Sequence, residues 1–177
     1  MSRLCFIDTE TTGLDPRIHR PYEVCWWLDD EPNPKGGRLA HELTHADSMA
    51  LKVGRYWERE MFKPGPNFVD AHALVRDLQG ATLVGSNPAF DAAMLTRVIG
   101  APIWHHRLIN VAEGGMWVFG WERPKGLADV AVECRVRGFE IPEPDHTAEG
   151  DVRTTRAVYD ALRSIRAGHP APLPALR

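Results

Sequence analysis

The chain opens with a short apolar run, residues 4–7, that ends in two acidic residues and a turn. Runs of this length are typical of a buried central strand. Asp8 and Glu10 lie two positions apart, so on an extended strand both side chains point to one face at the strand's carboxyl end. Ligands of open α/β sheets bind at this edge, and adjacent carboxylates are tolerated beside a divalent cation. A surface turn with two solvated acids is the alternative at this point.

Further along the chain, apolar residues recur with two different periods. Short apolar runs bounded by Gly, Pro, Asn or Asp predict strands, and spacings of three and four predict helices. Strands are expected at residues 24–28, 38–44, 82–85 and 103–109, with a turn over 29–37. Helices are expected as one or two short segments within 49–62, and then at 68–78, 88–99, 111–119, 127–136 and 151–165. This order predicts a single mixed-sheet α/β domain.

A third carboxylate, Asp91, falls in the first turn of the helix expected at 88–99, directly after the strand at 82–85. Asn87 is expected to cap this helix, with Pro88 at its first position. The helix dipole favours an acid in the first turn without any further function, so Asp91 alone does not indicate a site.

A histidine and a fourth acid, His146 and Asp151, stand five residues apart near the last expected helix. On one continuous helix this spacing would put them on different faces. Prolines at 142 and 144 break the chain just before them. This break favours His146 at or before the helix start, folded back, with Asp151 pointing inward. The alternative is a histidine near a helix end and an ordinary surface acid.

Composition limits the class of protein. The chain has 177 residues and a formal net charge of −3, enough for one full core and unsuited to coating long duplexes by bulk electrostatics. This net charge still allows the protein to bind the end of a nucleic-acid chain through a few local cations and a metal. No apolar run approaches the ~20 residues of a membrane helix and no signal-peptide pattern opens the chain, so no membrane partner is expected. The three cysteines are isolated in apolar stretches, as in a cytoplasmic protein with reduced thiols.

The candidate residues fall in three stretches: F-I-D-T-E-T-T-G-L at 6–14, S-N-P-A-F-D at 86–91 and H-T-A-E-G-D at 146–151. In order and spacing these resemble the three motifs of the DnaQ-like (DEDDh) 3′→5′ exonucleases. That family includes polymerase proofreading subunits, RNase T and oligoribonuclease. Its tyrosine branch carries Tyr four residues before the last aspartate, where this chain has Thr147. His146 stands five before it, as in the DEDDh branch.

The resemblance implies an RNase H-like fold, in which helices flank a five-stranded mixed sheet with an antiparallel second strand. It implies one exonuclease domain over residues 1–166. Residues 167–177 are rich in proline and are expected to form a disordered tail.

The resemblance also implies a reaction. Two divalent metal ions, Mg²⁺ or in its place Mn²⁺, would be held by Asp8, Glu10, Asp91 and Asp151. His146 would be the general base. The substrate would be the 3′ end of a single-stranded nucleic acid, with DNA favoured, cut to nucleoside 5′-monophosphates. Two alternatives stay open: trimming of RNA, as by oligoribonuclease, and a weakly active module that binds a DNA polymerase.

Contacts to the terminal nucleotide are implied as well. In the family the loop after the first strand holds this nucleotide, which here points to Thr9, Thr11 and Leu14. Asn87 and Phe90 match positions that line the same pocket. Phe90 is suited either to pack a base or sugar or to form ordinary core.

The stretch at 50–56 resembles a further pocket segment and adds Val53 to these candidates. Relatives often have Asn-Gly-Tyr there, whereas this chain has Gly-Arg-Tyr at 54–56. Basic residues are frequent in and after this stretch: Lys52, Arg55, Arg59 and Lys63. They are either a solvated helix face or, if they flank the cleft, a grip on phosphates.

Overall fold

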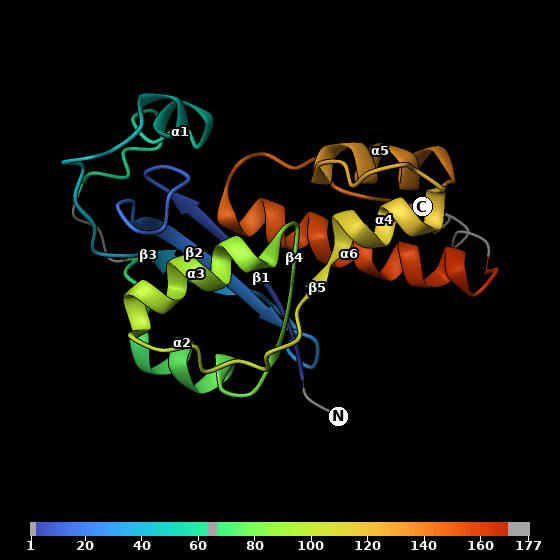
Figure 1. The fold of residues 1–177 in the computed structure, drawn as a ribbon, viewed down its shortest axis with the longest axis horizontal. Coiled ribbons are helices and arrows are strands. Elements are labelled where there is room, and N and C mark those ends of the chain that lie inside the picture. Colours follow the sequence, from blue (N-terminus) through green and yellow to red (C-terminus); the bar gives the residue numbers. More distant parts are fainter. Residues whose placement is uncertain (1–2, 64–66, 170–177) are drawn as a thin grey trace.

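The structure is a computed structural model and describes residues 3–63 and 67–169. Within these residues, five strands form one sheet (Figure 1). The strands are β1 (Leu4–Thr11), β2 (Pro21–Leu28), β3 (Lys35–Arg38), β4 (Thr82–Gly85) and β5 (Ile109–Asn110). Their order is β3-β2-β1-β4-β5. β2 is antiparallel to β1 and β3, whereas β4 is parallel to β1 and β5. The predicted mixed sheet with an antiparallel second strand is confirmed.

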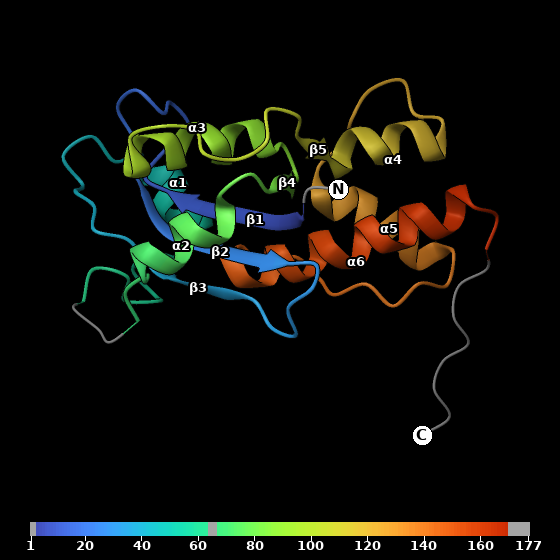
Figure 2. The same cartoon turned by 90° about the horizontal axis from the view of Figure 1, so that it is seen from below.

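The helices are α1 (Ser48–Val53), α2 (Ala71–Leu78), α3 (Pro88–Ile99), α4 (Val111–Phe119), α5 (Leu127–Val136) and α6 (Ala148–Arg166). Both views show α2 and α3 in one group and α4, α5 and α6 in another (Figures 1 and 2). In the described part of the chain, no helix combines the length and the apolar character needed to cross a bilayer.

The alternation of side chains along β1 separates two cores. Phe6 packs with residues of α4, α5 and α6, whereas Cys5 and Ile7 pack with residues of α2 and α3. Because neighbouring residues of a strand point to opposite faces, each group of helices covers one face of the sheet. This alternation continues into the acidic end of β1.

Several elements were predicted correctly. The strand at 82–85 and the helices at 88–99, 111–119 and 127–136 have the bounds expected from the sequence. Turn residues mark these ends, such as Gly100 and Gly120, which both end a helix in the left-handed conformation.

The strand predicted at 38–44 is wrong. β3 covers Lys35–Arg38, mostly inside the stretch predicted as a turn. Gly36 pairs with Cys25, and a Cβ atom at position 36 would lie 2.6 Å from the carbonyl oxygen of Val24. Close backbone approach therefore specifies this strand, and an apolar pattern does not.

Two helix starts and one strand also differ from expectation. α2 begins at Ala71, after the capping residue Asp70, and not at 68. α6 begins at Ala148, because the Thr147 hydroxyl accepts the N–H of Gly150, and not at 151. β5 covers only residues 109–110, so it shares a single residue with the strand expected at 103–109. The capping side chains of Asp70 and Thr147 decide where the two helices begin.

The remaining differences are local. Asn87 precedes α3 but makes no side-chain capping bond, since its backbone is left-handed (φ 67°); its N–H donates to Asn110 Oδ1 at 3.2 Å. In the stretch 49–62, helix α1 ends at Val53 and turns follow. The Pro-Gly-Pro break at 64–66 and the tail beyond 169 lie outside the described residues.

Candidate active site

Acidic side chains from β1 and α6 meet at the carboxyl end of β1. Asp8 and Glu10 alternate with Phe6, so they lie on the sheet face that α6 covers. Asp151 lies in the first turn of α6. One carboxylate oxygen each from Asp8, Glu10 and Asp151 lie within 4.8 Å of one another. Residues 143 positions apart in sequence thus form one cluster.

Asp91 reaches the same edge from α3, on the other face. It is 3% exposed, and its Oδ1 accepts a hydrogen bond of 2.7 Å from the Thr9 hydroxyl. Asp91 is not among the three acids whose oxygens lie within 4.8 Å, but its charge raises the pKa of Asp8. The fourth predicted acid therefore borders the cluster.

Burial is the main cause that shifts these acids toward their protonated forms. It raises the pKa of Asp8 well above the usual range, and the charges of Asp91 and Glu10 add to this. Burial, followed by the charge of Asp151, raises the pKa of Glu10 to about 8. Burial also raises the pKa of Asp91 to about 7 and that of Asp151, where His146 opposes the rise. Ionising the whole cluster therefore requires a compensating positive charge.

This donor set fits a divalent metal ion. Carboxylate oxygens are the ligands that Mg²⁺ and Mn²⁺ prefer. Three of them lie within 4.8 Å of one another, a limit only slightly above the ~4.2 Å between ligands on opposite sides of an ion with bonds of about 2.1 Å. A cation there would also favour the ionised forms that burial and repulsion disfavour.

His146 lies in the loop immediately before α6, as expected from the proline break. It is exposed, with a left-handed backbone (φ 58°). The loop folds back onto the helix, because the Asp145 N–H donates to Asp151 Oδ1 at 3.1 Å and the Thr147 hydroxyl donates to Asp145 Oδ1 at 2.7 Å. The imidazole therefore belongs to a loop that is tied to one of the acids.

The segment around α1 lies near the carboxyl end of β1 (Figure 1). The Asp47 N–H donates to the Thr12 carbonyl at 2.7 Å, which joins the start of α1 to the turn after β1. At Gly54, just after α1, an added Cβ would lie 2.0 Å from the Tyr22 hydroxyl and 3.0 Å from Glu10 Oε2. The absence of a side chain at position 54 thus allows this wall to approach Glu10 closely.

The residues expected to contact substrate fall into two groups. Leu14 and Val53 are 79% and 46% exposed, Asn87 is exposed and Phe90 is half-buried. Thr9 and Thr11 are buried, and their hydroxyls donate to Asp91 and to the Gly13 carbonyl. The hydroxyls of the two threonines therefore serve the protein's own structure.

The four basic residues do not form one solvated helix face. Arg59 forms an ion pair of 2.6 Å with Glu23, and Lys63 pairs with Glu60 at 2.5 Å. Arg55 donates to the Asp145 carbonyl at 3.3 Å, while Lys52 lies in the last turn of α1. Arg55 and Arg59 thus reach toward the acidic cluster.

Glu23 and Asp145 were not predicted as parts of this site, and Arg59 was predicted only as one of four basic residues with two alternative roles, a solvated helix face or a grip on phosphates. One signal was present for Glu23, which pairs directly with Glu10 across β1 and β2. Side chains opposite one another on paired strands are neighbours. The roles of Arg59 and Asp145 depend on how two loops fold, and no spacing in the sequence indicates them.

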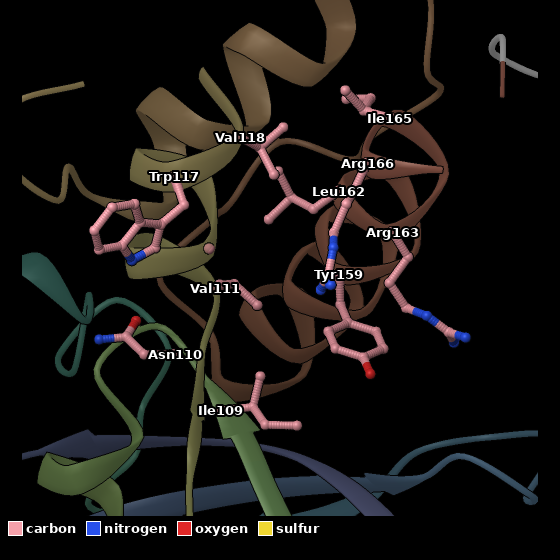
Figure 3. A pocket seen from close by; sticks show the side chains of 11 residues that line it. Ile109, Asn110, Val111, Trp117, Val118, Tyr159, Leu162, Arg163, Ile165 and Arg166 are labelled. Carbon is pink, nitrogen blue, oxygen red and sulfur yellow. The ribbon is translucent and has the colours of Figure 1, made fainter. Parts of the chain in front are cut away.

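A separate cavity of about 620 Å³ lies between α4 and α6 (Figure 3). Trp117, Val118, Tyr159 and Leu162 line it, with Arg163 and Arg166 at its margin. None of the four acids lines it, so this cavity is distinct from the acidic cluster.

Comparison with known proteins supports the fold. No protein-family model matches the chain, and no curated protein matches it in sequence. Among solved structures, the apo form of a nuclease matches with a TM-score of 0.57 at 22% identity, over 93% of this chain and 74% of that one. NrnC of Brucella melitensis gives 0.58 at 18% identity, over 95% and 76%. E. coli exonuclease I in complex with a dA16 oligonucleotide gives 0.62 at 15% identity, over 95% and 42%.

These structural neighbours are DnaQ-like exonucleases. The RNase H-like fold implied by the motif resemblance is therefore confirmed. At these identities the likeness establishes the fold and not the reaction.

Proposed function

We propose that the protein is a metal-dependent 3′→5′ exonuclease that releases nucleoside 5′-monophosphates from single-stranded nucleic acid. The observation that carries this proposal is the meeting of Asp8, Glu10 and Asp151, with oxygens within 4.8 Å of one another, at the edge of an exonuclease-like fold. The domain would extend over residues 1–166, with 167–177 as a tail.

The four acids would hold two metal ions: Asp8, Glu10, Asp91 and Asp151. When bound, such ions supply an activated water and stabilise charge on the transition state and the leaving 3′-oxygen. His146 would accept the proton of the attacking water at a ring nitrogen, since histidine can take a proton near neutral pH. Its exposed loop position leaves room for the ring to move toward the bound substrate.

The pocket favours an unpaired terminal nucleotide. Leu14 and Val53 offer exposed apolar surface and Phe90 is half-buried; at the positions that the motif resemblance implies, these side chains would suit a base or sugar that is not stacked in a duplex. Among the structural neighbours, one holds a dA16 oligonucleotide and another pGG. We favour single-stranded DNA as substrate and keep RNA as the alternative.

One experiment tests this proposal. The purified chain is incubated with 5′-labelled single-stranded DNA, single-stranded RNA and blunt duplex, with Mg²⁺ and with EDTA. We expect a ladder of shortened products on a single strand, slower cutting of duplex, and no cutting in EDTA. Asp151→Asn should abolish the ladder, whereas Asp160→Asn, an exposed acid on the same helix, should not. A substrate that stays intact under Mg²⁺ and Mn²⁺ would refute the proposal.

The same experiment addresses the second candidate, a weakly active module that binds a DNA polymerase. Intact substrate, together with Mn²⁺ binding measured separately by calorimetry, would favour this alternative. Three cysteines, Cys5, Cys25 and Cys134, are buried and free. This supports the cytoplasm as the proposed compartment.

A further inference from the structure

A fifth carboxylate stands beside the acidic cluster. Glu23 of β2 pairs in register with Glu10 of β1, and both side chains point to the face that α6 covers. Its charge adds to the pKa rise of Glu10 and of Asp8. Even so, the oxygens that gather within 4.8 Å belong to Asp8, Glu10 and Asp151 and not to Glu23.

Arg59 holds this fifth carboxylate aside. Its Nη2 donates to Glu23 Oε1 at 2.6 Å, and the two side chains are only 18% and 16% exposed. The other terminal guanidinium nitrogen, Nη1, donates to the Gly54 carbonyl at 3.3 Å. Arg59 thus joins Glu23 to the wall that approaches Glu10.

The second oxygen of Glu23 is also engaged. Oε2 accepts the N–H of Ala148 at 3.2 Å, at the first residue of α6, the helix that carries Asp151. A carboxylate at a helix N-terminus is favoured by the unpaired N–H groups there. Both oxygens of Glu23 are therefore engaged by the protein itself, one by a cation and one by the helix.

We propose that Arg59 is a positioning residue that keeps Glu23 from acting as a metal ligand, so that a site surrounded by five carboxylates binds metal through four. This inference rests on the proposed function for its consequence in turnover. Its basis is the geometry of the ion pair and the cross-strand pairing. Without Arg59, Glu23 would be an uncompensated acid next to Glu10 and would turn toward the bound cations.

The test is a double-mutant cycle on the full chain. Mn²⁺ binding is measured by calorimetry without nucleic acid for the wild type, Arg59→Gln, Glu23→Gln and the double variant. Arg59→Gln should bind Mn²⁺ roughly tenfold more tightly, which is the lower end of the range expected for one charge at contact distance. Glu23→Gln alone should weaken binding by no more than about threefold, because it removes no ligand while Arg59 holds Glu23 aside, so the cycle has a clear coupling energy. The double variant should return to within about threefold of the wild type.

Turnover gives a second readout. Arg59→Gln should cut a single strand at least ~10-fold more slowly, since an extra ligand displaces metal from its working position, and adding Glu23→Gln should restore much of the rate. Arg59→Lys, which keeps the charge, should lie nearer the wild type. Arg76→Gln removes the mostly exposed partner of Asp77 on α2 and is the control, with unchanged Mn²⁺ affinity.

Wild-type Mn²⁺ affinity in Arg59→Gln, or a defect that Glu23→Gln does not relieve, overturns the proposal. If Arg59→Gln does not fold, a loss of Mn²⁺ affinity of about tenfold or more in Glu23→Gln overturns it, because Glu23 would then be a ligand in the wild type. The outcome is separable from that of the exonuclease proposal. If the Mn²⁺ affinities follow the expected cycle but the protein cuts no substrate, only the exonuclease proposal is refuted. If the protein cuts substrate but the affinities do not follow the cycle, only the proposed role of Arg59 is refuted.

Discussion

Removing the charge of Glu10 should stabilise the metal-free protein at alkaline pH. Burial and the neighbouring acids raise the pKa of Glu10 from 4.5 to about 8. Because this pKa is higher in the folded state, folding favours the protonated form of Glu10. The stability that protonation contributes is complete below about pH 4.5 and is lost as the pH rises to about 8. At ~1.4 kcal/mol for each pKa unit, ionised Glu10 opposes folding by roughly 5 kcal/mol, which solvent screening and relaxation reduce to about 2–3 kcal/mol.

Glu10→Gln keeps the shape of the side chain and removes its charge. Urea unfolding in EDTA should give this variant a free energy of unfolding about 2–3 kcal/mol above the wild type near pH 8. Near pH 5 the two proteins should agree within ~1 kcal/mol. Glu58→Gln, at an exposed position after α1, is the matched control and should change the free energy by less than ~0.5 kcal/mol.

Two results would refute this reasoning. One is a metal-free wild type that is equally stable near pH 5 and pH 8. The other is a Glu10→Gln variant less stable than the wild type at the higher pH. Saturating Mg²⁺ should narrow or reverse the difference, because the wild type binds the ion more tightly and gains more stability from it.

Three further changes have distinct expected outcomes. His146→Ala should lower turnover by roughly 10²–10⁴-fold with little change in Mn²⁺ affinity by calorimetry, whereas Asp151→Asn should weaken metal binding as well; a large loss of affinity in His146→Ala would make the histidine a ligand. Phe90→Ala should raise KM on single strands more than it lowers kcat, and equal rates of the wild type on blunt duplex and single strand would contradict an unpaired-end pocket. Gly54→Ala should destabilise by ~1–3 kcal/mol through overpacking, whereas Gly126→Ala, which meets no atom within 4 Å, should stay within ~1 kcal/mol in thermal melts.

The parts of the fold predicted correctly are those in which one local signal decides. Helices α4 and α5 carry an apolar face bounded by turn residues, and their bounds were predicted without error. β3 was misplaced because two glycines pair by backbone approach, which leaves no apolar pattern to read. The start of α6 was missed because it depends on the Thr147 cap. The predicted start was Asp151, three residues after the first residue of the helix, Ala148.

The acidic positions were predictable for a similar reason. The spacing of Asp8 and Glu10 on a strand dictates a shared face, whatever the rest of the chain does. The ion pair of Arg59 and Glu23 joins residues 36 positions apart, one of them in a turn. It follows from how that turn folds over the strand ends, which periodicity does not describe.

The alternation along β1 also limits how this protein can tolerate changes of length. Its carboxylates face α6 and the Thr9 hydroxyl meets Asp91 on the opposite face. One residue inserted or deleted between Phe6 and Asp8 would exchange these faces, so that hydroxyls would face the acidic cluster and carboxylates would face α3. The register irregularity in the β1–β2 pairing falls between Glu10 and Thr11, just beyond the last acid. Length variation among homologues should therefore be absent before this point and tolerated in the loop after it.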